Sequence, residues 1–417
     1  MLNFITWKSI QSRKFTTLLC VISIALSVTL FLGIERIRNG AKDGFTNTIS
    51  KTDFIVGAKG SPLQLLLYSV FHIGGAVNNI KIDTYNDIKN NPIVEWTIPF
   101  SLGDSYRGYR VVATNESFYL NYRFRGDHSV EFSEGELPND TFDVALGAEV
   151  AKKLNLKLGE AIVLSHGIAQ ESLLNHDQTP FKIKAILKST QTPIDTGVYI
   201  TLEGMEALHF GWESGVPDGE AIAQERFKKE NIEINQITSF LVKLKSRIAI
   251  LKMRRDIDLY SKEPIMAVIP GLALQEMWET IGYVEKILFL VSICVTVVGV
   301  LGIIISLYTS INERRREMAI LRSLGAKSRD IFFLLLYESA LIVFFGCLLG
   351  VMSMFGITLL IRPWLESNFS VYIPLSALSK TEWIYLGAIF VTGTIAGIIP
   401  AIKAYMYSLR DGLSPKI

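Results

Sequence analysis

The sequence predicts an integral membrane protein of four transmembrane α-helices, with both termini in the cytoplasm and a large mixed α+β extracytoplasmic domain between the first two helices. Three observations predict it: four long apolar stretches, basic short segments beside an acidic long one, and alternating strand and helix patterns within the long segment. The chain of 417 residues is 49% hydrophobic and 20% charged, with a mean hydropathy of +0.31. It is too apolar for an ordinary soluble enzyme and too charged to lie wholly in a membrane.

Four stretches reach the roughly 20 residues that a helix needs to cross the hydrocarbon core. Uncharged runs cover 20 residues at 15–34, 26 at 287–312 and 20 at 383–402, and residues 331–361 hold one charge, Glu338. We assign the spans to residues 15–36, 285–312, 331–361 and 383–403. The remaining segments are 1–14, 37–284, 313–330, 362–382 and 404–417.

The first span is expected to be an uncleaved anchor rather than a signal peptide. Its uncharged run is longer than the about 7–15 residues of a signal-peptide core, and no small-x-small cleavage site follows it. Residues 1–14 are expected to form either a short interfacial helix with Trp7 at headgroup depth or an extension of the first span.

Lys and Arg are distributed unequally among the segments. Residues 1–14 carry three basic and no acidic groups, residues 313–330 six and three, and residues 403–417 three and one. Residues 35–286 carry 28 basic and 33 acidic groups, a net of −5. Because basic flanks stay in the cytoplasm, residues 313–330 and both termini are expected there, and residues 37–284 outside a cytoplasmic (inner) membrane. The total charge of +2 is the sum over segments expected on two sides of the membrane, so it does not suggest nucleic-acid binding.

The long segment shows strand and helix patterns in alternation. Residues 143–166 predict strand, helix, turn and strand, and further strands are expected at 181–187, 197–202 and 242–244. Ile248–Tyr260 has helical spacing, with Ile248, Leu251, Ile257 and Leu259 as its apolar positions. Residues 212–235 are polar and predict an exposed insertion. Pro62–Gly74 predicts a core helix or, alternatively, an amphipathic element at the outer membrane boundary.

We find no catalytic set in the sequence. It contains no phosphate-binding loop of the Gly-x-x-x-x-Gly-Lys-[Ser/Thr] type, no Gly-x-Ser-x-Gly and no His-Glu-x-x-His. No metal site is expected, because the closest pair of histidines is ten residues apart. The histidines are His72, His128, His166, His176 and His209. The three cysteines, Cys20, Cys294 and Cys347, all fall within spans.

Residues 313–326 predict a short charged helix between two spans. Met318, Ile320, Leu321 and Leu324 form an apolar stripe, and Arg314, Arg315, Arg316 and Arg322 a charged face, with Glu313 and Glu317 four residues apart. Gly325 suits the helix end, and Ser328 is expected to cap the next helix, with Asp330 in its first turn. A generic basic helix beside the membrane would explain the arginines, because they would bind anionic lipid or fix the topology. It would not explain why the helix has a defined end at Gly325 and why a new helix begins directly after it.

The spans also contain glycines at close-packing spacing. Gly346 and Gly350 lie in the third span and Gly393 and Gly397 in the fourth, which predicts either a packed bundle or a dimer contact. Glu338 is expected to be a polar anchor bound to a partner, or else a carboxylate that reaches toward the cytoplasmic interface.

Residues 313–350 resemble the coupling segment of MacB/FtsX-type (type VII) ABC transporter permeases, including the LolC and LolE lipoprotein-release subunits. The family pattern is Glu-Arg-x-x-Glu-apolar-x-x-x-Arg-x-x-Gly-Ala, which Glu313, Arg314, Glu317, Arg322, Gly325 and Ala326 match. Glu338 matches an acidic residue early in the next span. Leu146–Leu164 resembles the MacB-like periplasmic core domain, and Pro400–Ala404 resembles the Pro-Ala-x-x-Ala ending.

The resemblance implies a non-catalytic, mechanotransmission subunit that works with a dimer of separate cytoplasmic ABC ATPase subunits, which bind ATP and Mg, and with a second permease copy or paralogue. This chain is expected to hold no cofactor. It would export or extract a lipoprotein, peptide, lipid or small toxic molecule, with a possible extracytoplasmic partner protein. The alternatives are an FtsX-like regulator of an extracytoplasmic enzyme and a membrane-anchored sensor without an ATPase.

Overall fold

The computed structural model describes residues 14–76, 78–165, 179–210, 232–313, 320, 323, 325–369 and 375–410. The chain divides into two compact units. One comprises Met1–Gly40, Ile281–Trp364 and Ile373–Ile417, and the other comprises Ala41–Thr280 with Leu365–Tyr372. The helix expected before the first span, and most of the expected polar insertion at 212–235, lie outside the described residues.

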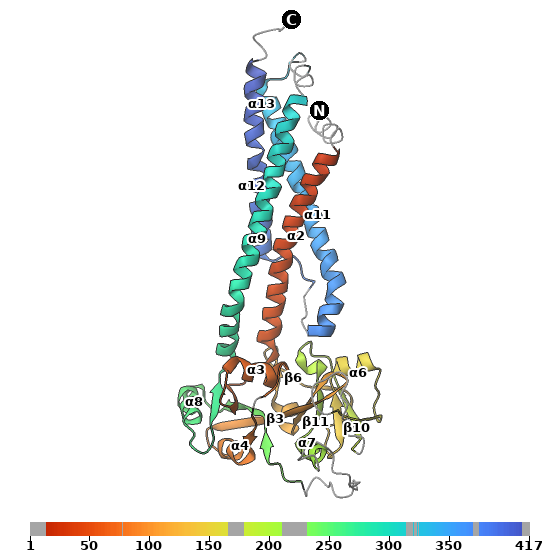
Figure 1. Ribbon diagram of the computed structural model, residues 1–417, viewed down its shortest axis with the longest axis vertical. Helices are drawn as coiled ribbons and strands as arrows, with labels where there is room; N and C mark the ends of the chain where they lie inside the picture. Colours follow the sequence, from red (N-terminus) through yellow and green to blue (C-terminus); the bar gives the residue numbers. More distant parts are fainter. Residues whose placement is uncertain are drawn as a thin grey trace. The chain divides into compact units, whose positions relative to one another are not determined.

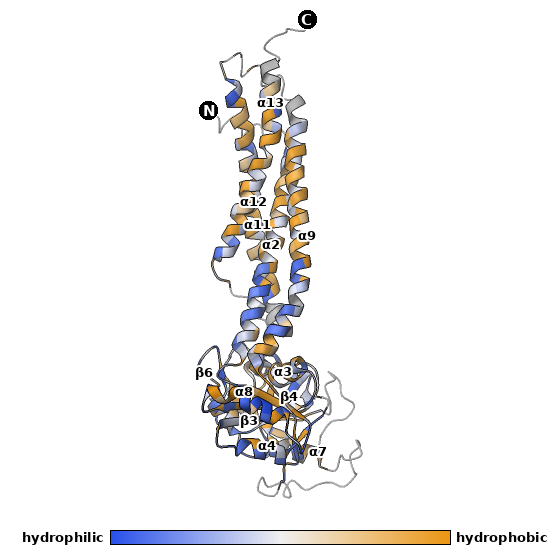
Figure 2. Ribbon diagram, turned by 90° about the vertical axis from the view of Figure 1, so that its left-hand side faces the viewer, coloured by the Kyte–Doolittle hydropathy of each residue, from blue (hydrophilic) through white to orange (hydrophobic). Residues whose placement is uncertain are grey.

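The first unit is built from long helices (Figure 1). Their bounds are α2 Lys14–Thr48, α9 Pro270–Glu313, α11 Ser328–Phe369, α12 Lys380–Ala396 and α13 Ile398–Arg410. Four helical stretches of the described residues are long and apolar enough to cross a membrane: Lys14–Thr48, Pro270–Thr309, Ser328–Arg362 and Lys380–Met406. Figure 2 shows the apolar colour along these helices. The four predicted spans are thereby matched by four candidate transmembrane helices.

These helices differ from the predicted spans in two ways. First, α2, α9 and α11 continue well beyond the apolar runs, α11 even past Pro363, because a change from apolar to polar side chains does not by itself end a helix. Second, the fourth span is two helices, since α12 ends at Ala396 and α13 begins at Ile398. Pro400 lacks the N–H that would bond to the Ala396 carbonyl, and its ring crowds that carbonyl. The proline therefore explains the break at Gly397.

The second unit is a mixed α+β domain around a ten-stranded sheet of order β14-β1-β13-β3-β4-β11-β8-β10-β7, with β9 paired to β10. Pairs β4–β11 and β8–β10 are parallel, and the other neighbours are antiparallel. The sheet strands are β1 Phe54–Ala58, β3 Val94–Tyr106, β4 Tyr109–Thr114, β7 Phe132–Gly135, β8 Asp143–Leu146, β9 Ala161–Ile162, β10 Phe181–Leu187, β11 Val198–Thr201, β13 Ser239–Leu244 and β14 Ile265–Val268.

Two short ribbons and six helices are the other elements among the described residues of this unit. The ribbons pair β2 (Ile80–Lys81) with β12 (Gln236–Ile237) and β5 (Arg123–Phe124) with β6 (His128–Ser129). The helices are α3 Pro62–Val70, α4 Ile82–Lys89, α5 Glu116–Asn121, α6 Ala148–Leu154, α7 Leu202–His209 and α8 Ile250–Asp258, with single 3₁₀ turns at Pro193–Thr196 and Arg247–Ala249.

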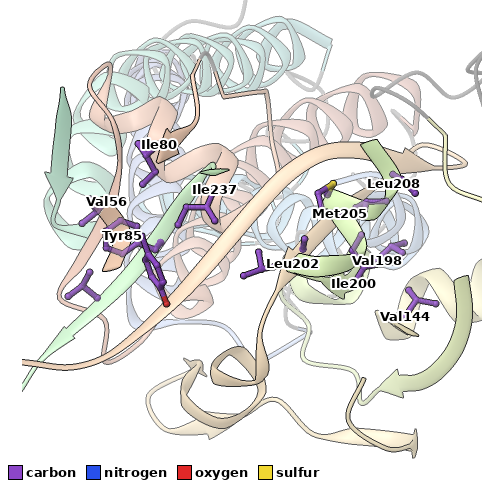
Figure 3. Packing of buried hydrophobic residues seen from close by; sticks show 14 of the residues in the cluster. Val56, Ile80, Tyr85, Val144, Val198, Ile200, Leu202, Met205, Leu208 and Ile237 are labelled. Carbon is purple, nitrogen blue, oxygen red and sulfur yellow. The ribbon is translucent and has the colours of Figure 1, made fainter. Parts of the chain in front are cut away.

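The sheet is buried on both faces, because successive side chains of a strand point to opposite sides. In β11, Val198 and Ile200 belong to one hydrophobic core and Tyr199 to the other. Figure 3 shows the first core, where Leu202, Met205 and Leu208 of α7 lie beside Val198 and Ile200. Helices α4, α6, α7 and α8 contribute to this core, and α3 and α5 to the second. Two covered faces explain why several strands read as continuous apolar runs.

The strands expected at 143–146 and 181–187 are present with those bounds, and the helix between 147 and 154 is α6. The segment Pro62–Gly74 contains α3, whose Leu65 and Leu66 are buried in the second core, so the core-helix alternative holds. Of the four apolar positions assigned to Ile248–Tyr260, only Ile257 is buried. Helix α8 packs through Met253 and Ile257 against β14, while Ile248, Leu251 and Leu259 are exposed.

A buried carboxylate and a histidine form a pair in the second unit. Asp104 of β3 is fully buried, and its Oδ2 lies 3.5 Å from Nε2 of His209, the last residue of α7. His209 Nδ1 lies 2.9 Å from the Met205 carbonyl oxygen. Burial lowers the pKa of His209, but Asp104, the Met205 carbonyl and Glu206 raise it by more, so the pKa lies above its ordinary value. The folded unit therefore binds this proton more tightly than the unfolded chain does.

This linkage predicts a pH-dependent effect of His209→Gln. The stabilisation from a raised histidine pKa is fully present below the unfolded value of about 6.5 and is lost as pH rises through the folded pKa. We therefore expect His209→Gln to lower the thermal midpoint of the full-length chain more at pH 6 than at pH 8.5. Differential scanning fluorimetry measures both differences, and His128→Gln, on the exposed strand β6, controls for the loss of a histidine. A larger loss at pH 8.5 would contradict the pairing.

Candidate functional site

The charged segment between α9 and α11 is described in part. Helix α9 ends at Glu313. Arg314, Arg315, Arg316, Glu317, Met318, Leu321, Arg322 and Leu324 lie outside the described residues, so the predicted apolar stripe and charged face stay predictions. Ile320 is exposed. Gly325 has a φ of +95°, a backbone conformation that favours glycine and suits the end of a helix.

The restart of the chain after Gly325 differs from the expectation in one detail. Helix α11 begins at Ser328, so Ser328 is its first residue and Lys327 occupies the N-cap position. The N–H of Lys327 donates to Asp330 Oδ2 at 2.7 Å. The Asp330 carboxylate thus accepts a hydrogen bond from the backbone N–H at the N-cap position, as the side chain of the third helical residue does in a capping box. Asp330 lies in the first turn as expected, and the assignment of Ser328 as the cap was wrong by one position.

The glycines of α11 allow close approach of α2. A Cβ at Gly346 would lie 2.7 Å from side-chain atoms of Ile24, and one at Gly350 would lie 2.8 Å from the backbone oxygen of Ala25. Thr29 Oγ1 also donates to the Gly350 carbonyl at 3.1 Å. Close backbone approach of this kind is what small residues provide where lipid supplies no hydrophobic drive. Gly346 and Gly350 therefore contact a helix of the same chain. Of the two predicted alternatives, the packed bundle rather than the dimer contact applies to them.

Helix α12 packs on α11 in the same manner. A Cβ at Gly393 would lie 2.7 Å from Val343, and one at Gly397 would overlap Ser339. Glu338, next to Ser339, is 3% exposed. A carboxylate that reached to the interface would be exposed, so its burial favours the alternative of a polar anchor bound to a partner. The predicted packing residues of the third and fourth spans therefore meet inside the first unit.

A buried ion pair joins α2 to α12. Arg36 Nε donates to Glu382 Oε1 at 2.8 Å, and the two side chains are 7% and 3% exposed. Arg36 Nη2 also donates to the Ser376 carbonyl at 2.9 Å, and the guanidinium lies 4.5 Å from the ring centroid of Phe355 in α11. Glu382 additionally accepts from the backbone N–H of Ser379 at 2.7 Å as part of a capping box. One pair thus ties α2, α11 and the start of α12 together.

Sequence reasoning missed this pair. It placed Arg36 at the end of the first span and Glu382 at the end of a loop with balanced charge, and it used both only to count charges. A signal was available in the sequence. Arg36 and Glu382 carry opposite charges, each stands beside an apolar span, and both were assigned to the same side of the membrane. Their pairing still required knowing that the first and fourth spans are neighbours.

Three of the five histidines, His72, His128 and His209, lie in the part of the chain that the structure describes. Among the described residues, no group of three or more His, Cys, Asp or Glu side chains is placed to hold a metal ion. His72 packs near Tyr199, and burial and then nearby Arg110 lower its pKa to about 4. His209 pairs with Asp104. His166 and His176 lie outside the described residues.

The glycine contacts predict a position-specific effect within α11. Gly350→Ala places a methyl group against the backbone of Ala25, which cannot yield as a flexible side chain does, so we expect a loss of about 1–3 kcal/mol in the free energy of unfolding. Gly356→Ala is the matched control, because no atom lies within 4 Å of the added Cβ. Detergent-solubilised variants can be compared by thermal unfolding. Equal midpoints for the two variants would contradict the contact.

The buried ion pair predicts that removing one of its two partners lowers the free energy of unfolding more than removing one partner of an exposed pair. Arg36→Gln leaves Glu382 buried without its charged partner, so we expect a loss of about 3–5 kcal/mol. Lys188→Gln is the control, because Lys188 and its partner Glu131 are 66% and 58% exposed, and an exposed pair of this kind is worth about 0–1 kcal/mol. We expect the double variant Arg36→Met/Glu382→Met to lose less than the sum of the single variants. Thermal midpoints test this, and simple additivity would show that the two side chains are not coupled.

Comparison with known proteins agrees with this architecture. Residues 17–259 match the family described as MacB-like periplasmic core domain, and residues 289–409 match FtsX-like permease C-terminal. An uncharacterized ABC transporter permease, YvrN of Bacillus subtilis (strain 168), is 35% identical over 112 residues, which is 27% of this chain and 26% of YvrN. The macrolide export ATP-binding/permease protein MacB 1 of Yersinia pestis bv. Antiqua (strain Antiqua) is 29% identical over 155 residues, 37% of this chain and 23% of that protein.

A longer match reaches the MacB protein of Wolinella succinogenes, which is 21% identical over 404 residues, 95% of this chain and 58% of that protein. The extracellular domain of the ABC-type transporter YknZ from Gram-positive bacteria is 11% identical, covering 52% of this chain and 99% of that one, with a TM-score of 0.30, too low to support a fold assignment. The matches to YvrN and to the Yersinia MacB span about a quarter of those relatives. On its two domain matches, the chain belongs to the family of ABC transporter permeases that combine a MacB-like periplasmic core domain with an FtsX-like permease region.

Proposed function

We propose that this chain is a mechanotransmission permease subunit, which converts ATP hydrolysis by a separate cytoplasmic ATPase into movement of its extracytoplasmic domain. The observation that carries the proposal is the length of α2 and α9, unbroken helices of 35 and 44 residues. At 1.5 Å per residue each exceeds the roughly 30 Å hydrocarbon core by about 20 Å or more. An unbroken helix transmits a displacement along its axis without a hinge.

The internal contacts of the bundle support the same proposal. The close approaches at Gly346 and Gly350 hold α11 to α2, and the Arg36–Glu382 pair holds α12 to α2. Helix α11 begins directly after the charged segment 313–326. A push on that segment would therefore reach α2 and α12 through packed side chains rather than through flexible loops.

We place the charged segment 313–326 in the cytoplasm, in a groove of the ATPase, with Glu317 and Leu321 at the contact. The ATPase, as a dimer of subunits, would bind ATP and Mg, and a second permease copy or paralogue would complete the assembly. Membership of the permease family and the relation to YvrN support this placement. The chain would lie in the cytoplasmic (inner) membrane, with residues 37–284 outside.

The substrate class is proposed from the relatives and from the chemistry of a membrane-bound machine. Several relatives are named macrolide export proteins, so a small toxic molecule heads the candidates. A lipoprotein, peptide or lipid taken up on the outer side fits the same mechanism. An FtsX-like regulatory role would use the same motion to act on an extracytoplasmic enzyme.

The assignment of residues 313–326 as the contact with the ATPase predicts that substitutions in this segment weaken ATPase binding. Glu317→Arg reverses a charge of the segment and Leu321→Arg places a charge in its apolar stripe, so we expect each to reduce co-purification of a Walker-motif ATPase with the full-length chain by at least about tenfold, the effect of about 1.4 kcal/mol. The measurement is the ATPase-to-permease ratio after mild detergent extraction.

Glu279→Arg is the control, because Glu279 is an exposed residue of α9 far along the chain from the segment. It should retain the ATPase. Normal ATPase recovery with both segment variants would refute the coupling role of residues 313–326. Absence of any ATPase with the unaltered chain would instead favour a membrane-anchored sensor.

A further inference from the structure

Helix α8 carries apolar side chains on two opposite faces. Met253 and Ile257 are buried against the domain core. Ile248, in the turn that leads into the helix, and Leu251 and Leu259 are 95%, 75% and 68% exposed. They are the three most exposed large apolar side chains among the described residues of the second unit. Single exposed apolar residues are ordinary, but three on and directly beside one short helix make this surface a candidate for docking.

The exposed side chains follow one line along the helix. Leu251 and Leu259 are three and eleven residues beyond Ile248, and Arg255 stands four residues from each leucine, which is the spacing of one helical face. We name Ile248, Leu251, Lys252, Arg255 and Leu259 the α8 outer face. Its centre is an arginine between two leucines, a pattern that offers both apolar anchors and a fixed positive charge.

The surroundings of the α8 outer face are basic within an acidic region. Residues 245–259 carry five basic and two acidic groups, whereas the rest of residues 35–286 carries 23 basic and 31 acidic groups. Arg254 is paired with Asp258 at 3.6 Å. Within the described part of the chain, Arg247, Lys252 and Arg255 form no ion pair. A surface that complements this face would therefore carry negative charge.

We propose that the α8 outer face docks an extracytoplasmic protein that presents an apolar groove bordered by carboxylates. Arg255 lies within the line of leucines rather than beside it, so a purely apolar layer such as lipid chains would have to desolvate its charge. A groove with a fixed carboxylate accepts a Leu-Arg-Leu line, and arginine with apolar anchors is typical of the core of protein interfaces. Recognition of a helix face in a groove is a common mode of protein binding.

Photo-cross-linking in cells that express the full-length chain tests the proposal. Leu251 is replaced by benzoylphenylalanine, and Leu120, an exposed leucine of α5, is the matched control position. We expect a dominant protein adduct from position 251 and none from position 120. Mass spectrometry of the cross-linked peptide should find a segment of net negative charge that contains apolar residues. Adding Lys252→Glu/Arg255→Glu should lower the yield about tenfold, the effect of about 1.4 kcal/mol, at equal amounts of membrane-inserted chain.

Several outcomes would overturn the proposal. A cross-link to a peptide of this same chain would make the face a contact between copies. A basic or uncharged partner segment, or a yield that ignores the charge reversals, would remove the complementarity argument. Absence of a protein adduct, with flotation of the purified chain on phosphatidylglycerol but not phosphatidylcholine vesicles that depends on Lys252 and Arg255, would assign the face to lipid. Glu317→Arg, which tests the ATPase coupling, is expected to leave the adduct unchanged, so the two proposals fail separately.

Discussion

The Arg36–Glu382 pair is the interaction on which the arrangement of the helical unit depends most. It joins the end of an apolar run in α2 to the first turn of α12, and both side chains are almost fully buried. A buried pair of this kind adds little net stability compared with apolar packing, but breaking it by removing one partner is costly. Its effect is therefore specificity: α2 and α12 are neighbours in one register, because any slip would leave two buried charges unpaired.

The glycine contacts act together with this pair. Gly346 and Gly350 set the distance between α2 and α11, and Gly393 and Gly397 set the distance between α11 and α12. Three helices are thus joined pairwise, two pairs by close backbone approach and the third by an ion pair. Contacts of this kind favour movement of the three helices as one body, which the proposed mechanotransmission would require.

The second unit is stabilised by a different set of contacts. Its sheet is buried on both faces, and the buried Asp104 is matched by His209 at the end of α7. The surfaces that the core leaves open are then the places for recognition. On the described part of this unit, the α8 outer face stands apart because its apolar side chains are not needed by the fold, whose demands on this helix are met by Met253 and Ile257.

The sequence by itself determined the four candidate transmembrane helices, the mixed α+β domain and the family, because apolar run length, strand alternation and the charged segment before Ser328 are local properties of the chain. The tertiary structure decided what local patterns leave open. Helical spacing showed that Ile248–Tyr260 is helical but not which of its two apolar faces is inside, since that depends on β14. Likewise, the Arg36–Glu382 pair required knowing that helices 346 residues apart in sequence are neighbours, which no local pattern encodes.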